Sequence, residues 1–380
     1  MRDVLPKLLP WWRDGVSTGV GTVVATFRSA PRPAGASMLV GPGGEAVGSV
    51  SGGCVEGAVY ELAQQVLDDR HPVLQRYGVS DEDAFAVGLT CGGILDVFVE
   101  VIDRDSFPEL EEVAADIDAG RPVAVATVVQ HHDEAWVGRR LVVRPESDPR
   151  PPLGSLGSPR ADDAVVADAR GLLAGGRNET LHYGPDGQRR GEGMAVFVSS
   201  YAPKPRMLVF GAIDFAAAVA RVGSFLGFHV TVCDARQVFA TASRFPDADE
   251  VVVKWPHKFL AEEVAAGRVD ERTVLCVLTH DPKFDVPVLE AALRLPEVGY
   301  IGAMGSRRTH DDRIARLREA GVTDAELSRL SSPIGLDLGA RTPEETAISI
   351  AAEIIALRWG GQGRRLIEED GPIHHHGVPR

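Results

Sequence analysis

The chain has 380 residues, enough for two or three domains, and 44% of them are hydrophobic, as in an ordinary globular protein. Its net charge of −14 argues against a nucleic-acid partner bound through a broad basic face. No apolar run is long enough to span a bilayer, which argues against membrane contact. Residues 1–10 are too short and too proline-rich for a secretory signal, so we expect a cytoplasmic location. Four cysteines without a CxxC spacing predict neither a disulfide framework nor a structural zinc site.

The N-terminal part of the chain contains an internal duplication. Residues 21–102 and 126–201 carry matching segments in the same order, at a nearly constant shift of 126 − 21 = 105 or 154 − 48 = 106 residues. Each copy reads as strand, turn, strand, Gly-Ser loop, helix and strand. A short helix is expected within residues 1–14, and a connecting helix lies near 103–122. We therefore predict an N-terminal α/β domain, residues 1–202, built from two copies of one fold unit.

Two cysteines lie in glycine-rich loops of the first copy, and the second copy has neither. Cys54 follows Gly52 and Gly53, whereas the matching segment of the second copy ends in Gly157–Arg160. Cys91 precedes another Gly-Gly pair, in residues that only the first copy has. Because the fold unit does not need these cysteines, we assign both of them to a site.

The residues alone leave the chemistry of this pair open. Cys54 comes just ahead of a predicted helix, Glu56–Leu67, and a thiol at a helix N-terminus reacts more readily as a thiolate. The pair could bind a soft metal, carry sulfur or form a disulfide, and Arg32 could supply a cation nearby. The competing interpretation is a small buried hydrophobe, which we assign to Cys233 and Cys276 because both lie inside apolar strands.

A proline-rich linker at Tyr201–Arg206 introduces a second domain, residues 203–380. In this domain, short buried-type runs alternate with helical patterns, which predicts a Rossmann-like, doubly wound parallel sheet. The strands are expected at Met207–Phe210, His229–Cys233, Glu250–Val253, Val274–Leu278 and Gly299–Gly302. A last helix is expected after Thr342, which forms a capping box with Glu345 and is followed by Pro343 at the first helical position.

The first strand-to-helix turn of this domain keeps part of a dinucleotide-binding pattern. Gly211 stands at the first glycine position, and Asp234, 234 − 211 = 23 residues later, is placed where an acid would meet a ribose hydroxyl. Ile213 replaces the glycine that lets the backbone approach a pyrophosphate, and Asp214 adds a negative charge. The pattern predicts the fold and disfavours NAD(P), with a nucleotide kept as an alternative.

A better candidate anion site follows the fifth predicted strand. A turn that ends in Gly305 and Ser306 opens a helix predicted at His310–Ala320, whose free N–H groups and dipole favour phosphate. Arg307 and Arg308 add donors that suit a phosphate or a pterin phosphate. The alternative is a tight turn with two solvated arginines.

Two polar residues follow the fourth predicted strand. His280 could act as an acid or base or bind a ligand, and Asp281 comes next to it. Ligands collect at the carboxyl ends of parallel strands, so both residues are expected on one edge with Asp214, Asp234 and Gly305. By itself, a loop histidine more often satisfies local backbone groups, but this convergence favours a site.

These segments resemble the XdhC/CoxI family, proteins that assist the maturation of molybdenum hydroxylases such as xanthine dehydrogenase and carbon monoxide dehydrogenase. The resemblance covers nearly the whole chain and implies a cysteine-bearing N-terminal domain followed by a Rossmann domain. The family commonly has Gly-Ala-Gly-His where this chain has Gly211–Asp214. The matching stretches are Ser29–Arg32 with Gly35, Gly48–Glu56, Cys91–Gly93, Asp234–Arg236, Leu278–Pro282, Tyr300–Thr309, Pro333–Asp337 and Thr342–Ala347.

The resemblance implies a chaperone, rather than a catalyst, that binds molybdenum cofactor, protects it, supports its sulfuration and delivers it to a molybdenum hydroxylase apoenzyme. A cysteine desulfurase and a second copy of the chain, in a homodimer, are further expected partners. In this interpretation Cys54 and Cys91 contact the cofactor beside Arg32, Gly52 and Gly53, and the glycine turn before the arginine pair holds its phosphate. The alternatives are an NAD(P)-dependent oxidoreductase, which intact glycines would favour, and a sulfurtransferase or redox protein working through Cys54.

Overall fold

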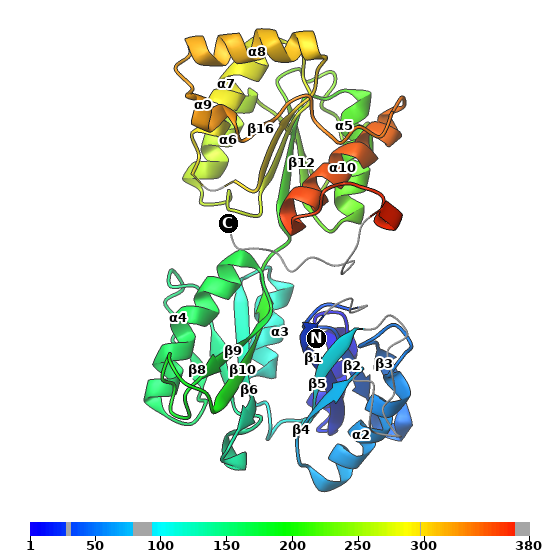
Figure 1. Ribbon diagram of the computed structural model, residues 1–380, viewed down its shortest axis with the longest axis vertical. Helices are drawn as coiled ribbons and strands as arrows, with labels where there is room; N and C mark the ends of the chain where they lie inside the picture. Colours follow the sequence, from blue (N-terminus) through cyan, green and yellow to red (C-terminus); the bar gives the residue numbers. More distant parts are fainter. Residues whose placement is uncertain (28–31, 79–92, 297, 369–380) are drawn as a thin grey trace. The chain divides into compact units, whose positions relative to one another are not determined.

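The chain folds into two compact units, with the boundary between Pro203 and Lys204 (Figure 1). The structure is a computed structural model, and it describes residues 1–27, 32–78, 93–296 and 298–368. Within these ranges, no helix is both long and apolar enough to cross a membrane.

The N-terminal unit contains two five-stranded antiparallel sheets that share one strand order. The first sheet has the order β3-β2-β1-β5-β4, and the second has β8-β7-β6-β10-β9. The strands of the first are β1 (Thr18–Phe27), β2 (Ser37–Val40), β3 (Ala46–Gly48), β4 (Val73–Tyr77) and β5 (Ile94–Ile102). Those of the second are β6 (Val123–His131), β7 (Arg140–Val143), β8 (Leu153–Gly154), β9 (Glu179–Tyr183) and β10 (Met194–Tyr201). The identical order is what a duplicated fold unit requires, and these two halves are called the first and second repeats below.

Each repeat buries a helix on one face of its sheet. Helix α2 (Glu56–Asp69) presents an apolar stripe at i, i+4 and i+7 to the first sheet, and α4 (Pro159–Gly175) does the same in the second. The opposite faces of the two sheets share a core that includes Phe98 and Phe197. A further core also includes side chains of α1 (Leu5–Arg13) and α3 (Leu110–Asp118). The two repeats therefore pack as one unit.

The C-terminal unit is a six-stranded parallel sheet with the order β13-β12-β11-β14-β15-β16. Its strands are β11 (Arg206–Phe210), β12 (His229–Asp234), β13 (Glu250–Val253), β14 (Val274–Val277), β15 (Tyr300–Ala303) and β16 (Leu330–Ser331). Its helices are α5 (Asp214–Phe225), α6 (Pro256–Ala265), α7 (Pro282–Leu293), α8 (Arg307–Glu319), α9 (Asp324–Leu327) and α10 (Pro343–Trp359). Short 3-10 segments lie at Pro42–Gly44, Glu134–Trp136 and Leu366–Glu368.

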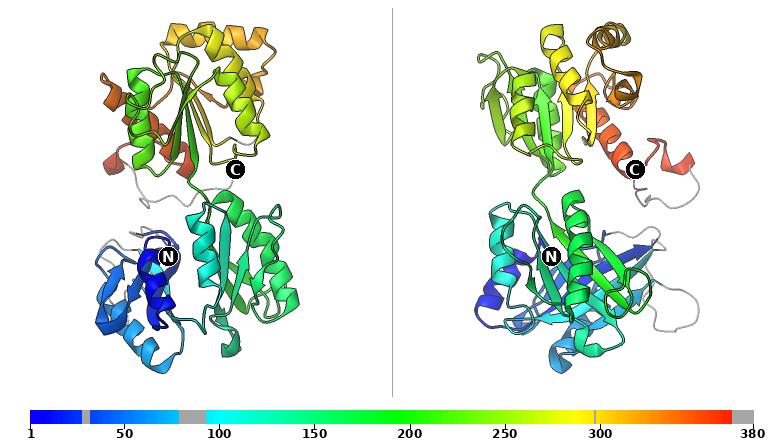
Figure 2. Two further views of the ribbon diagram at one scale, coloured as in Figure 1. Left: turned by 180° about the vertical axis from the view of Figure 1, so that it is seen from behind. Right: turned by 90° about the vertical axis from the view of Figure 1, so that its left-hand side faces the viewer.

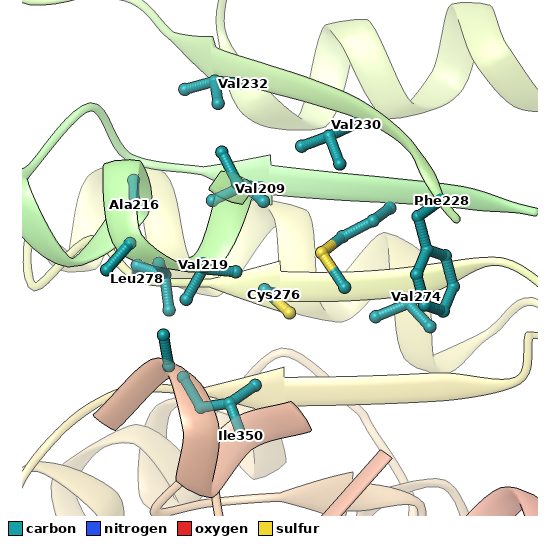
Figure 3. Packing of buried hydrophobic residues seen from close by; sticks show 14 of the residues in the cluster. Val209, Ala216, Val219, Phe228, Val230, Val232, Val274, Cys276, Leu278 and Ile350 are labelled. Atoms are coloured by element: carbon teal, nitrogen blue, oxygen red, sulfur yellow. The ribbon is translucent and has the colours of Figure 1, made fainter. Parts of the chain in front are cut away.

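Helices cover both faces of this parallel sheet (Figure 2), so its four central strands, β12, β11, β14 and β15, are buried on both sides. On one face, α5 and α10 pack against side chains such as Val209, Val230 and Cys276, and Figure 3 shows Ile350 of α10 pointing into this cluster. On the other face, α6, α7 and α8 pack against side chains that include Phe210. Burial on both faces explains the nearly continuous apolar strands.

The predicted α/β class and the Rossmann-like parallel sheet are confirmed. The capping box of α10 is also present, with Thr342 and Glu345 each accepting a hydrogen bond from the other residue's backbone N–H. Three details differ from the expectation. Each repeat has five strands rather than three. Helix α8 begins at Arg307 rather than at His310, because Ser306 caps it, and the two-residue strand β16 was not predicted.

Candidate functional site

The loop between β3 and α2, Gly48–Glu56, is organised around one carboxylate. Glu56 Oε1 accepts hydrogen bonds from the Ser49 hydroxyl at 2.6 Å and from the backbone N–H groups of Val50 at 3.2 Å and Ser51 at 2.9 Å. Its Oε2 accepts from the Ser51 hydroxyl at 2.5 Å and from the Gly53 N–H at 2.8 Å. Five donors therefore point at this side chain.

The remaining backbone donors of the loop are satisfied by its two serines. The Gly52 N–H donates to Ser49 Oγ at 2.9 Å, and the N–H groups of Cys54 and Val55 donate to Ser51 Oγ at 3.0 and 2.9 Å. All six N–H groups from residue 50 to residue 55 are thus used inside the loop. A bound anion would have to displace one of these contacts to reach a backbone donor here.

The glycines of this loop are explained by backbone conformation. Gly52 and Gly53 have φ values of +75° and +117°, which strain any other residue, and a Cβ atom would meet nothing within 4 Å at either position. They shape the turn that carries Cys54, which is half-buried and packs against the core of the first repeat. Their N–H groups donate to Ser49 and Glu56, and the contact that we expect these glycines to make with a cofactor stays a prediction.

The hydrogen bonds decide the ionisation of Glu56. Burial opposes the charge, but the Ser49 and Ser51 hydroxyls and the backbone N–H groups hold the pKa of Glu56 at about 2. The side chain is therefore a carboxylate at neutral pH. The sequence prediction missed this residue as a site organiser, although an acidic residue at the first position of a helix, shortly after two serines, is a usable signal.

The second repeat keeps the carboxylate and loses the turn. Asp162 occupies the position of Glu56, since 162 − 56 = 106, and accepts from the Ser155 hydroxyl at 2.8 Å and the Leu156 N–H at 2.7 Å. Helix α4 begins at Pro159, the counterpart of Gly53, three residues earlier than α2 does relative to the repeat. The first repeat thus replaces most of one helical turn with the glycine turn before Cys54.

The structure does not bring the other expected site residues of the N-terminal unit, Cys91 and Arg32, together with Cys54 in its described part. Cys91 lies outside the residues that the structure describes. Arg32 is 3.7 Å from Asp3 and lines a cavity of about 380 Å³, together with Asn178 and Tyr201 among others. Cys54 does not line that cavity.

In the C-terminal unit, the polar groups at the Gly211 turn form hydrogen bonds with one another. The Ala212 N–H donates to Asp234 Oδ2 at 2.8 Å, and Arg236 pairs with the same carboxylate at 2.8 Å. A Cβ atom on Gly211 would lie 2.8 Å from the backbone nitrogen of Thr279, so this glycine is required by packing. Burial favours the neutral acid, but the Arg236 and backbone hydrogen bonds keep the pKa of Asp234 below its ordinary value. The acid expected to meet a ribose is therefore already paired.

The neighbouring acidic residues have local partners. Asp214 begins α5 and forms an ion pair with Arg244 at 3.2 Å. Asp281 caps α7 by accepting from the Lys283 N–H and pairs with the Lys283 ammonium at 3.0 Å. His280 is exposed beside it at the carboxyl end of β14.

The N-terminus of α8 differs from every turn described so far. Ser306 caps the helix by accepting from the Thr309 N–H at 3.2 Å. Among the described residues, the four backbone N–H groups from Gly305 to Arg308 have no acceptor. Arg307 and Arg308 are exposed, and neither forms an ion pair in the described ranges, so the alternative of pairing with neighbouring acids is not observed. Free N–H groups, a helix dipole and two cations coincide here.

A buried ion pair lies beneath this turn and was not predicted. Arg313 donates to Asp285 Oδ2 at 3.0 Å and to the Met304 carbonyl at 2.7 Å. A Cβ on Gly305 would lie 3.6 Å from the Arg313 guanidinium. Burial raises the pKa of Asp285 to about 6 despite Arg313. The signal available in the sequence was helical spacing, which puts Arg313 one turn before the buried Leu317.

Two family models match this chain. The model described as "XdhC and CoxI family" matches residues 11–78 and 116–184, one stretch in each repeat, and the model described as "XdhC Rossmann domain" matches residues 207–354. The chain belongs to the XdhC and CoxI family. Among the described residues of this family member, no group of three or more His, Cys, Asp or Glu side chains could hold a metal ion.

The similar proteins align along most of the XdhC-type chain. A protein from Bacillus subtilis that is named as a probable xanthine dehydrogenase subunit is 29% identical over 89% of this chain and 92% of that protein. A "Molybdenum cofactor insertion chaperone PaoD" from Escherichia coli is 25% identical over 91% of this chain and 86% of its own length. A crystal structure of a xanthine dehydrogenase from Bacillus halodurans has a TM-score of 0.65 at 26% identity and covers 96% of this chain and 97% of that one.

Proposed function

We propose that this protein binds the molybdenum cofactor and serves in the maturation of a molybdenum hydroxylase. The observation that carries the proposal is the N-terminus of α8, where four N–H groups from Gly305 to Arg308 have no acceptor among the described residues. A phosphate group, such as the one on the pterin of the cofactor, is the ligand that such a helix end favours. Arg307 and Arg308 are exposed there, so both can reach an anion in a protein that is acidic overall.

The names of the similar proteins support the proposed role in the maturation of a molybdenum hydroxylase. One of them is named as a molybdenum cofactor insertion chaperone and another as a probable xanthine dehydrogenase subunit, which suits a protein that protects the cofactor and delivers it to an apoenzyme. Within this proposal Cys54, and Cys91 with it, contacts the cofactor or supports its sulfuration. The role is that of a chaperone, with the hydroxylase apoenzyme as the partner.

The alternative of an NAD(P)-dependent oxidoreductase has less support. In a dinucleotide-binding turn, the backbone N–H groups meet a pyrophosphate and the acid after the second strand meets a ribose. Here the Ala212 N–H and Asp234 bind each other, and Asp214 places a carboxylate at the start of α5. We therefore place the anionic ligand at α8 rather than at α5.

The test is to replace Arg307 and Arg308 together by alanine. A charge-assisted hydrogen bond contributes roughly 1.5–3 kcal/mol, so the double variant should bind cofactor at least about tenfold more weakly. The chain is co-expressed with a molybdopterin pathway, and bound pterin and molybdenum are measured by mass spectrometry and absorbance. The affinity is then compared by titration.

Arg316→Ala with Arg318→Ala is the matched control. It removes the same charge from the last turn of the same helix, where Arg318 pairs with exposed Asp324. This control should retain cofactor. Equal affinity in the Arg307/Arg308 variant and the wild type, with both chains folded, would refute the anion site at α8.

A further inference from the structure

We propose that Glu56 is a positioning residue that fixes Cys54 in one geometry on the surface of the first repeat. The carboxylate holds the Gly53 N–H directly, and it holds Cys54 through Ser51, whose hydroxyl donates to Glu56 Oε2 and accepts from the Cys54 N–H. The purpose of this arrangement, handling of the cofactor by Cys54, rests on the proposed function. The positioning itself does not.

The chemistry of the contacts requires a carboxylate at this position. Glu56 faces five donors and accepts from all of them, and three of these donors are backbone N–H groups that cannot reverse. A glutamine would place an NH₂ group against the Gly53 N–H in one orientation and against the Val50 and Ser51 N–H groups in the other. Either orientation leaves an N–H group facing a donor, so the loop opens.

The length of the side chain is specific to the first repeat. Asp162, at the matching position of the second repeat, reaches a serine hydroxyl and one N–H group, and no cysteine precedes it in that loop. Glu56 is one methylene longer and also reaches the Gly53 N–H at the far side of the glycine turn. The extra contact therefore accompanies the main structural difference between the two loops, the turn that carries Cys54.

The comparison with Asp162 also supplies a matched control. An asparagine at position 162 can accept from the Leu156 N–H with its oxygen and donate to the Ser155 hydroxyl with its nitrogen, because a hydroxyl can reverse its role. Asp162→Asn should therefore preserve its loop, whereas Glu56→Gln should not. The two variants change one carboxylate to an amide at equivalent positions.

The experiment measures alkylation of Cys54 by iodoacetamide in the full chain without cofactor, resolved by peptide mass spectrometry so that the other cysteines do not interfere. Loss of one charge-assisted contact raises the open population of a local segment by about tenfold. Glu56→Gln should therefore raise the alkylation rate of Cys54 by about that factor. Asp162→Asn should match the wild type. Thermal unfolding is measured alongside, because a merely structural carboxylate at position 56 would lower the stability of Glu56→Gln and leave the Cys54 rate unchanged.

Two further variants keep the proposal decidable if Glu56→Gln does not fold. Glu56→Asp should hold the serine side of the loop as Asp162 does, and it should lose the Gly53 contact, so the Cys54 rate should change while stability stays near that of the wild type. Ser51→Ala removes the acceptor of the Cys54 N–H and should change the Cys54 alkylation rate in the same direction as Glu56→Asp does. Wild-type Cys54 rates in both folded variants would overturn the proposal.

Failure of the proposed function would give a different result. If the Cys54 rate responds to Glu56 and cofactor retention responds to neither Cys54 nor Glu56, the positioning stands and the cofactor role of the loop falls. If the rate does not respond, the positioning falls whatever the cofactor does.

Discussion

Glu56 sets the response of its loop to acid. In the folded chain its pKa is about 2, because its hydrogen bonds outweigh burial, whereas the ordinary value is 4.5. The unfolded chain therefore takes up a proton first as the pH falls, so the stability from this group is complete above pH 4.5 and is lost toward pH 2. The free energy of unfolding of wild type minus that of Glu56→Gln should be constant above pH 4.5 and shrink below it. Urea titrations at several pH values measure it, and a difference that does not vary with pH would contradict the assignment.

The residues of the candidate sites were only partly predictable from the sequence. The arginine pair at the start of α8 could be named from the sequence, because Gly-x-x-Gly-Ser before a helix is a local pattern. Asp285 and Arg313 could not be paired, because they come from different helices and meet only after the sheet has formed. Asp234 was placed at the correct strand end, but its capture by Arg236 depends on a side-chain rotamer.

The sequence located long helices better than it located helix starts or very short strands. Helical periodicity and capping signals sufficed to locate α2 and α10 to within a few residues, since long periodic segments carry a strong signal. The start of α8 was misplaced because either Ser306 or Thr309 could cap it, and the hydrogen bond from the Thr309 N–H to Ser306 decides between them. Strand β16 has two residues, too few for any pattern.

The glycine turn should be exchangeable for the helical turn of the other repeat. Residues 51–54 are replaced by Gly-Ser-Pro-Arg, the sequence of residues 157–160. We expect α2 to begin three residues earlier and the free energy of unfolding to stay within about 1 kcal/mol, because the second repeat folds with that sequence. Circular dichroism and urea unfolding measure the change, and cofactor retention should fall. Loss of folding in this variant would show that the turn is needed by the first repeat itself.

The two units have separate hydrophobic cores. The clusters of the N-terminal unit draw on residues up to Ala202, and those of the C-terminal unit begin at Met207. Strand order in the duplicated unit was not evident from the sequence, because antiparallel partners are set by contacts distant in the chain, whereas the alternation of strand and helix was enough to predict the parallel sheet.

Residues 1–203 and 204–380 should therefore each fold when expressed alone. Calorimetry should record a cooperative unfolding transition for each fragment. The Cys54 alkylation rate of the first fragment should equal that of the full chain, and the second should keep the dependence of anion binding on Arg307 and Arg308. A fragment without a cooperative transition would mean that one unit needs the other.

The self-contained hydrogen bonding of the Glu56 loop has a thermodynamic consequence for whatever meets Cys54. A loop that becomes ordered only around its ligand loses backbone entropy on binding, about 1–2 kcal/mol for each residue fixed. Here residues 50–55 are already ordered by groups of the same chain, so association with Cys54 resembles the docking of two rigid surfaces. Such a surface discriminates by shape, because it does not remodel itself around a ligand that fits poorly.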